Sequence, residues 1–463
     1  MRVLPSLWAP ILIELSQRCR ASLMTPLPMT QWPVRSIPMA MDVQLSESLR
    51  FSGSWEGSMA SVLFGLFSIL QGTLFVCLAY QYFLVLASIR EPDLPTMDGV
   101  PSVRFAIAIP AHNEASVLAA TLQELSQLDY PPELFDVHVV ADHCTDNTSQ
   151  VAQQGGATVH ERTALPKGRK AYALQWLLKR MLGGDVDYEA VVVFDADSRV
   201  DDGFLRIMAG HLRSGIPVLQ GQHKIMNPQD SLLASIAAVD MRLNNRLRNQ
   251  SRSNLGFACR IMGDAMVFDV EVLRRYGWPA ESLTEDREYG YVLLAEGIRA
   301  RYIPQAVSLG EAASSWKQAE PQRLRWYRGL IDMQRRLATR LISRAVRLRS
   351  LALLDGAIEL LMPSYSSLAA VALANLILVV AFGVWLPLDI RTPLGVLGSA
   401  LLLSAWIAYP FLGLIVDRAP GWAYKALLLG PVYFVWRLWI SVLVRLRGDR
   451  TEWIRTLRRE ETK

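Results

Sequence analysis

The chain has 463 residues, 51% of them hydrophobic, a formal net charge of +5 and a mean hydropathy of +0.20. This balance favours a membrane protein with basic surfaces, and the length allows two or three domains. The four cysteines show no paired spacing and the six histidines form no cluster, which argues against a zinc site or a disulfide framework and leaves oxygen ligands for any metal.

The N-terminal segment 1–58 carries scattered prolines and no signal-peptide pattern, because its apolar run WAPILIEL is short and includes Glu14. We expect it to be a disordered arm, or to precede a true start at Met39, Met41 or Met59. Residues 59–87 carry no charge over a length that crosses a bilayer, which predicts a transmembrane helix.

From residue 103 the chain alternates short apolar strands with helices. Strands are predicted at 103–110, 135–142, 157–162 and 188–195, and helices at 114–127, after Asp146 and at 169–182. This rhythm predicts an α/β domain at 99–330 with a mostly parallel, doubly wound sheet. In such sheets, ligands bind beyond the carboxyl ends of the strands.

Polar side chains follow three of these apolar strands. They are Asn113 and Glu114 after the first, Asp142 at the end of the second, and Asp195 and Asp197 after VVVF. A carboxylate is costly to bury without a partner, so these groups are expected in an open cleft. Two aspartates two positions apart near a strand end can face one way and hold Mg²⁺ or Mn²⁺. Alone, the Asp-x-Asp pattern also fits chance or a helix N-cap; the other strand ends favour a metal site.

Two further motifs come later in the chain. The stretch SLTEDREYGYVLLAEG places Thr284 to Asp286 at the start of a helix, a pattern that also fits a capping threonine with first-turn acids. The stretch QRLRW (322–326) opens a segment with nine arginines and one aspartate at 322–349. From residue 330 the apolar side chains keep helical spacing, which predicts basic amphipathic interfacial helices over 331–362.

Apolar segments dominate the end of the chain. Residues 364–386 and 394–416 carry no charge and are predicted to be transmembrane helices. The segment 424–444 includes Lys425, Pro431 and Arg437, and is predicted to be transmembrane, re-entrant or interfacial.

The charges of the loops predict the orientation. By the positive-inside rule, the nine arginines at 322–349 place the domain at 99–330 in the cytoplasm. Three full crossings after it would leave the basic tail 445–463 outside, against the same rule. A re-entrant or interfacial 424–444 removes this conflict.

Taken in order, the motifs PAHNE, Asp142, DAD, TED and QRLRW, followed by membrane spans, resemble the membrane-embedded family-2 glycosyltransferases. That group includes the cellulose, chitin and hyaluronan synthases, the bacterial poly-N-acetylglucosamine synthases and ceramide glucosyltransferase. The resemblance implies an α/β GT-A (Rossmann-like) nucleotide-sugar domain joined to α-helical transmembrane and interfacial helices. It covers about 100–330 by motif and the remainder by layout.

The resemblance also implies a role for each matching residue. Judged from the sequence alone, the lysines of PKGRKAYAL fit equally well with the solvent-exposed start of a helix. The implied roles are a nucleoside pocket lined by Asn113, Glu114 and Asp142, basic groups Lys167 and Lys170 near the diphosphate, metal ligands Asp195 and Asp197 for Mg²⁺ or Mn²⁺, a general base Asp286, and a closing group of Gln322, Arg325 and Trp326 over the pyrophosphate and acceptor.

The implied activity is inverting hexosyl transfer from a UDP-sugar to a growing polysaccharide at the cytoplasmic face of the bacterial inner membrane. The alternatives are transfer of a single sugar to a lipid acceptor and, from another class, a non-catalytic assembly subunit. The expected partners are the UDP-sugar, a polysaccharide or lipid acceptor, membrane lipids and export or assembly proteins, with no nucleic acid.

Several departures from the family pattern bear on the acceptor. The stretch 255–273 lacks the Phe-Phe-Cys-Gly-Ser signature of cellulose synthases, and Gly263 and Asp264 stand where acceptor-binding loops fall in relatives. Asp142 is followed by His143 and Cys144 in place of the common Asp-Gly. These details look closer to poly-N-acetylglucosamine-synthase-like enzymes than to cellulose synthase.

Overall fold

The computed structural model describes residues 40–92, 102–184, 186–279, 282–385 and 391–446. The chain divides into two compact units, Met1–Leu63 and Phe64–Lys463, and the second unit holds every element discussed below apart from the start of α2. The expected N-terminal arm and the basic tail lie mostly outside the described residues.

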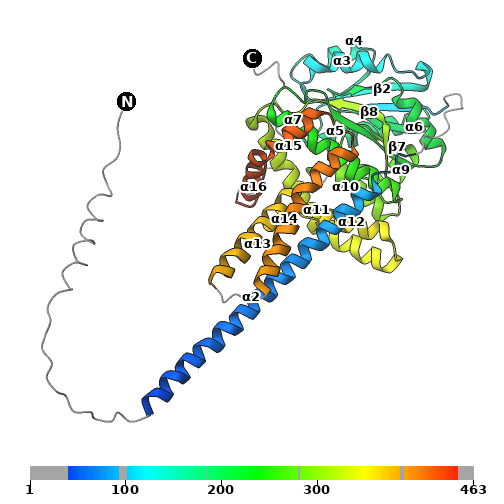
Figure 1. Ribbon diagram of the computed structural model, residues 1–463. Helices are drawn as coiled ribbons and strands as arrows, with labels where there is room; N and C mark the ends of the chain where they lie inside the picture. The colour runs from blue at the N-terminus through cyan, green and yellow to red at the C-terminus, as the bar shows by residue number, and fades with distance from the viewer. Residues whose placement is uncertain (1–39, 93–101, 185, 280–281, 386–390, 447–463) are drawn as a thin grey trace, which may run out of the picture. The chain divides into compact units, whose positions relative to one another are not determined.

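The centre of the second unit is an eight-stranded sheet in the order β3-β2-β1-β4-β7-β6-β8-β5 (Figure 1). The strands β3, β2, β1 and β4 are parallel, as predicted. Beyond them β7 runs antiparallel to β4 and β6, so the other half of the sheet is mixed. The strand bounds are β1 Phe105–Ala111, β2 Phe135–Asp142, β3 Thr158–Arg162, β4 Ala190–Val193, β5 Arg199–Val200, β6 Val218–Ile225, β7 Met266–Asp269 and β8 Arg301–Gly310.

Helices cover both faces of this sheet, as expected for a doubly wound α/β domain. Alternate residues of β1 separate the two cores, because successive side chains in a strand point to opposite faces. Phe105, Ile107 and Ile109 pack with α3, α4 and α6, whereas Ala106 and Ala108 face α5, α9 and α10. The helix bounds are α3 Ala115–Leu125, η1 Pro132–Leu134, α4 Thr148–Gln154, α5 Lys170–Leu182, α6 Phe204–Arg213, α7 Leu232–Leu243, the π-helix η2 Asn244–Gln250, α8 Ser251–Asn254, α9 Val270–Tyr276 and α10 Glu285–Ala295.

The helix α2 spans Ala40–Ala87, which corrects the expectation that residues up to 58 form an irregular arm. The physical reason is that Pro38 is the last proline before the apolar segment, so nothing after it interrupts a helix. Its stretch Ser61–Ala87 is long and apolar enough to span a membrane, as predicted for 59–87.

The basic segment after β8 forms two helices, α11 (Trp316–Leu348) and α12 (Leu351–Leu361). The apolar stripe of α11, which the sequence assigns to a membrane interface, is instead buried against α10 and α12, with Met333 and Leu341 at its centre. Exposed apolar side chains appear at the corner between the two helices, where Val346, Leu348 and Leu351 are all more than half exposed. The exposed apolar surface of these two helices is therefore at this corner and not on the stripe of α11.

The helices α13 (Tyr365–Trp385) and α14 (Arg391–Val416) supply two more candidate spans, Tyr365–Phe382 and Leu394–Val416. They pack directly on α2 through a buried cluster of Leu74, Leu78, Leu368, Ala372, Leu402 and Trp406. Polar side chains within the described part of this bundle bond to one another: Gln71 and Asn375 both donate to Ser399 Oγ, at 2.5 and 2.9 Å. The interior of the bundle is therefore filled by its own side chains.

The final described segment is a bent pair of helices, α15 (Gly421–Leu428) and α16 (Gly430–Leu446), which meet at 57°. The first helix packs on α7 through Ala423 and Ala426. The second holds Arg437, whose Nε donates to Tyr327 Oη of α11 at 3.0 Å and whose Nη1 lies 3.8 Å from Asp240 of α7. Both helices therefore rest against elements that adjoin the sheet domain.

Candidate active site

The carboxyl ends of β1, β2 and β4 lie side by side, because β1 pairs in parallel with both neighbours. Asn113, with a positive φ of 55°, joins two of these ends: its Oδ1 accepts from Thr145 N at 2.7 Å. Glu114 is buried, and its backbone N–H donates to Thr148 Oγ1 at 2.9 Å. The two residues predicted for the nucleoside pocket are therefore fixed to the loop that follows β2.

Asp142, predicted to lie near the uracil, is nearly buried at the end of β2. Its Oδ1 accepts from Arg162 Nη1 at 2.5 Å and lies 2.9 Å from His143 Nδ1. Arg162 also donates to the carbonyl of Pro166, in the loop before α5, at 2.6 Å. The sequence analysis did not identify Arg162, which supplies the counter-charge that allows Asp142 to be buried.

Lys170 is the first residue of α5. Its charge interacts with Asp195, which follows β4, and with Glu285 and Asp286 at the start of α10. Its ammonium donates to Asp195 Oδ1 and, at 2.7 Å, to the carbonyl of Gly263. Burial opposes its charge, but Asp195, Glu285 and Asp286 act in the other direction and the pKa of Lys170 is raised. The other predicted lysine, Lys167, lies exposed on the loop before α5.

Asp195 and Asp197 stand at the open end of β4, and both are partly exposed. Hard carboxylate oxygens at an open edge fit Mg²⁺ or Mn²⁺, since these ions bind one or two carboxylates and take the remaining ligands from water and substrate phosphates. The described residues contain no cluster of three or more potential metal-ligating side chains, so a bound ion would depend on the nucleotide for other ligands. The two aspartates fit that kind of site.

Asp264 is a fully buried carboxylate that fixes the end of β4. Its Oδ1 accepts from Asp195 N at 3.0 Å and from Ser198 Oγ at 2.7 Å. Its Oδ2 accepts from Ser308 Oγ at 2.6 Å and lies 2.8 Å from His223 Nδ1. Burial works against its charge, but these bonds hold the pKa of Asp264 well below its usual range. The sequence associates Asp264 with the acceptor, whereas the structure places it against the backbone of Asp195, one of the two predicted metal ligands.

The residues of the TED motif face this cleft from the start of α10. Thr284 occupies the N-cap position, but its side chain makes no capping hydrogen bond. Asp286 is half-buried and packs against Gly263: a Cβ built on this glycine would lie 2.8 Å from Asp286 Oδ2. Gly263 also has a φ of +86°, so a glycine is required there on both grounds.

Glu285, to which the sequence gives no separate role, is buried beside Asp286. Burial and the adjacent charge of Asp286 raise the pKa of Glu285 to about 7, although Lys170 and Arg325 oppose the shift. The side chain of Glu285 is therefore partly neutral near pH 7.

The helix α11 carries Gln322, Arg325 and Trp326 past this helix start. Gly329 makes the approach possible, because a Cβ there would lie 2.4 Å from Thr284 Oγ1. The ring of Trp326 is partly exposed, with the guanidinium of Arg323 4.7 Å from its centroid. The structure therefore joins Lys170, Asp195 and Asp286 through Gly263. The predicted nucleoside group lies at the ends of the neighbouring strands β1 and β2, the QRLRW residues lie on α11, and Lys167 lies on the loop before α5.

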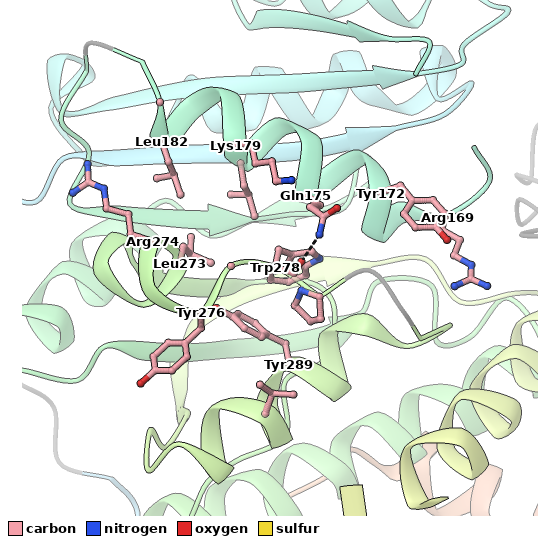
Figure 2. A pocket seen from close by; sticks show the side chains of 15 residues that line it. Arg169, Tyr172, Gln175, Lys179, Leu182, Leu273, Arg274, Tyr276, Trp278 and Tyr289 are labelled. Carbon is pink, nitrogen blue, oxygen red and sulfur yellow. Dashed lines mark hydrogen bonds between the residues drawn. The ribbon is translucent and has the colours of Figure 1, made fainter. Parts of the chain in front are cut away.

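A separate cavity of about 1070 Å³ lies along α5, on the side of α9 and α10 (Figure 2). Figure 2 shows Gln175 donating to the backbone carbonyl of Trp278, at 2.8 Å, with Tyr172 and Tyr289 also in the lining. None of the predicted site residues, all of which the structure describes, lines this cavity. It does not mark the catalytic cleft.

Comparison with known proteins agrees with this geometry. Residues 101–329 match the family described as Glycosyltransferase like family 2. The chain carries a family 2 glycosyltransferase domain. The predicted GT-A fold is confirmed: a mannosyltransferase from Pyrobaculum calidifontis, solved with GDP-Man and Mn²⁺, superposes with a TM-score of 0.51 at 20% identity, over 77% of this chain and 99% of that one.

Two curated relatives differ in what they make. The beta-monoglucosyldiacylglycerol synthase of Nostoc sp. PCC 7120 is 25% identical over 62% of this chain and 63% of its own length. The catalytic subunit of the UDP-forming cellulose synthase of Komagataeibacter sucrofermentans is 26% identical over 63% of this chain and 39% of its own. The matched part of this chain therefore spans less than two thirds of the length of these relatives.

Replacing Asp264 by Asn is expected to lower kcat/KM and the affinity for Mn²⁺ by about tenfold to a hundredfold. The amide nitrogen of Asn is a donor and cannot accept from the groups that Asp264 holds, so the backbone of Asp195 loses its anchor. The measurement is UDP release as a function of Mn²⁺ concentration. Asp187→Asn, at an exposed carboxylate, is the matched control. Identical Mn²⁺ curves for D264N and wild type would contradict this prediction.

The raised pKa of Glu285 predicts a specific pH dependence of stability. An acid whose pKa rises from 4.5 to about 7 on folding stabilises the fold fully below pH 4.5 and loses that contribution as the pH rises through 7. The loss is on the order of 3 kcal/mol. In metal-free buffer, the melting temperature of Glu285→Gln, relative to that of wild type, should therefore increase between pH 5 and 8. The control Glu133→Gln, at an exposed residue, should show the same pH dependence of melting temperature as wild type. Parallel curves for E285Q and wild type would disprove the assigned shift.

Proposed function

We propose that this protein transfers a hexose from a UDP-sugar to an acceptor hydroxyl, with inversion at the anomeric carbon, at the cytoplasmic face of the bacterial inner membrane. The observation that carries the proposal is the position of Lys170, which donates to Asp195 Oδ1 and to the carbonyl of Gly263, the residue against which Asp286 packs. It joins a diphosphate-binding edge and a candidate base in one cleft. The family 2 match supports the same reading.

In this mechanism the nucleoside lies against Asn113, Glu114 and Asp142, at the ends of the first two strands. Asp195 and Asp197 would hold a divalent cation, which neutralises charge on the diphosphate as it departs. Lys170, already bonded to Asp195, adds a fixed positive charge at the same place.

On the acceptor side, Asp286 takes the proton of the acceptor hydroxyl. The hydroxyl oxygen forms a bond to the anomeric carbon while the bond from that carbon to the diphosphate oxygen breaks, and UDP leaves with the electron pair. Gln322, Arg325 and Trp326, on the first turns of α11, would close over the pyrophosphate and acceptor. One displacement without a covalent sugar intermediate inverts the anomeric configuration.

A lipid acceptor is the reading that the packing supports better. Within the described residues, α2, α13 and α14 contact one another directly, and their polar side chains are bonded to each other. A lipid needs no passage through this bundle, because its headgroup reaches the cleft from the membrane surface. The similarity to the beta-monoglucosyldiacylglycerol synthase is in line with this reading.

Extension of a polysaccharide is the second candidate, and a group of aromatic rings favours it. The ring of Tyr409 lies 6.1 Å from that of Tyr82 and 6.0 Å from that of Tyr365, measured between ring centroids. Aromatic faces are common contacts for sugar rings. The similarity to the cellulose synthase subunit belongs with this candidate. Product analysis separates the two: a ladder of oligomers indicates the polysaccharide, and a single glycolipid indicates the lipid.

The donor reaction is tested by UDP release from purified full-length protein. UDP-glucose, UDP-N-acetylglucosamine and UDP-galactose are supplied in turn with Mg²⁺ or Mn²⁺, beside Asp195→Ala and Asp286→Asn. We expect release with one donor, lost on chelation and in D195A, because that carboxylate would hold the cation. Folded protein that is silent with all three donors and with added membrane lipid extract would overturn the proposal.

We also propose that α15 and α16 form a bent element on the catalytic face instead of a fourth crossing. Arg437, in the middle of α16, contacts Tyr327 and Asp240, which adjoin the cytoplasmic domain. The C-terminus is then cytoplasmic. A fluorescent protein fused after Lys463 should therefore fluoresce, and alkaline phosphatase at the same position should be inactive. An active phosphatase fusion would establish a fourth crossing.

A further inference from the structure

Four arginines gather where the catalytic domain meets α12, and two carboxylates of α12 face them. We call Arg248 of η2, Arg252 of α8, Arg260 of the following loop and Arg287 of α10 the arginine cluster. The carboxylates are Asp355 and Glu359. None of these six residues has a role in the mechanism above.

One of the two carboxylates is fully engaged by a single arginine. Arg252 Nε donates to Asp355 Oδ2 at 2.8 Å, and both side chains are buried. Tyr80 Oη donates to Asp355 Oδ1 at 2.5 Å and accepts from Arg252 Nη2 at 2.9 Å. This pair is electrically balanced.

The other carboxylate, Glu359, is shared by all four arginines, and Arg252 Nη1 lies 3.8 Å from its Oε1. Arg260 bonds Glu359 Oε1 through Nε at 2.9 Å and Nη2 at 2.5 Å, while Arg287 Nη2 lies 4.0 Å from the same oxygen. The charge of Arg248 also reaches Glu359. Four guanidinium groups therefore face two carboxylates of α12. Asp286 also reaches Arg287, but its charge is shared with Lys170. Asp240 of α7 also attracts Arg248 and Arg260, but its charge is shared with Arg323 and Arg437.

The excess of positive charge affects the pKa of one arginine in the cluster, and another arginine has an unsatisfied hydrogen-bond donor. Burial and the like charge of Arg287 lower the pKa of Arg260 to about 10, even with Glu359 in direct contact. Arg287 Nε is buried and has no hydrogen-bond partner among the described residues. The side chains of Arg260 and Arg287 are still 18% and 19% exposed, so the cluster is not closed from outside. Unfilled donors and unbalanced charge of this kind are relieved by an anion.

The cluster lies on the acceptor side of the catalytic cleft. Arg287 directly follows Asp286, and Arg260 is three residues before Gly263, which packs against Asp286. The same α12 that carries Glu359 exposes Leu354 and Leu361, which suit contact with lipid. A π-helix, here carrying Arg248, is often found at functional sites.

From these contacts we propose that the arginine cluster binds the phosphate of an anionic lipid acceptor and leaves a hydroxyl of the same headgroup within reach of Asp286. The inference rests on the proposed function and narrows its acceptor to a class. Guanidinium groups match phosphate because they donate paired hydrogen bonds in a fixed plane. A neutral diacylglycerol would leave the excess charge unbalanced.

The test compares two acceptors with the same acyl chains, phosphatidylglycerol and diacylglycerol, in a non-ionic polyoxyethylene detergent. Full-length protein is given the active UDP-sugar, and transfer to lipid is measured beside UDP release. We expect phosphatidylglycerol to be the better acceptor by about tenfold or more, as charged hydrogen bonds allow. Arg248→Gln and Arg287→Gln should each reduce this ratio toward one. Arg260 is not substituted, because its loss would leave the buried carboxylate of Glu359 without its two shortest hydrogen bonds.

A binding measurement accompanies the transfer assay. Phosphatidylglycerol should raise the melting temperature of wild type and of Arg274→Gln, an arginine exposed on α9, but not that of R248Q or R287Q. Inorganic phosphate is the second probe. If it alone gives the whole stabilisation, the cluster binds a free anion and the acceptor assignment is overturned.

The remaining outcomes separate this inference from the proposed function. Equal transfer to both lipids, or a preference kept in R248Q and R287Q, overturns the inference and leaves glycosyl transfer intact. UDP release that no lipid accelerates does the same. If no condition releases UDP, the proposed function fails, and binding alone decides whether the cluster is a phosphate-lipid site: stabilisation lost in both variants supports it, and stabilisation unchanged by them refutes it.

Discussion

The candidate site depends on one buried carboxylate, Asp264, which collects donors from segments far apart in the chain. It fixes the backbone of Asp195 after β4, the side chain of His223 on β6 and that of Ser308 on β8. A buried charge is tolerated only when its hydrogen bonds are satisfied, so these segments cannot move independently without exposing it to a large penalty. The parallel half of the sheet is thereby tied to the mixed half. The position of Asp195 thus depends on both halves of the sheet.

A second constraint joins this edge to the membrane side of the molecule. Gly263 gives its carbonyl to Lys170 and, having no side chain, lets Asp286 approach it closely. Gly329 does the same for α11 against Thr284, so α11 crosses the start of α10 just after its QRLRW segment. The other end of that helix packs on α12, which carries Asp355 and Glu359. Contacts at α12 and at the cleft are therefore linked through two stiff helices, α10 and α11.

The sequence was sufficient to predict the elements whose formation depends mainly on residues close together in the chain. The strand predicted at 135–142 has the bounds of β2, and the polar residues after the apolar strands do meet at one edge, because parallel neighbours end together. No strand was predicted after residue 195: β6 mixes polar and apolar residues and β8 contains Pro304, so their pairing depends on distant partners. For the same reason the partners of Asp142 and Asp264 could not be read from spacing. The apolar stripe of α11 was assigned to a lipid interface, since periodicity shows that a face is buried but not what buries it.

The charges around α12 differ from those around Lys170, and this difference can keep the acceptor and the donor at separate places in the proposed site. On the donor side, Lys170 is matched by Asp195, and Asp197 adds a further negative charge, so this region favours a nucleotide that arrives with its cation. On the acceptor side, the arginine cluster outnumbers its carboxylates, so that region favours an anion without one. A diphosphate bound on the acceptor side would contact the arginine cluster, but its cation would lack Asp195 and Asp197 as ligands. An anionic headgroup on the donor side would meet Asp195 and Asp197 and be repelled. In the proposed mechanism, the opposite charge excess of the two regions would assign the nucleotide to one region and the anionic headgroup to the other, with Asp286 between them.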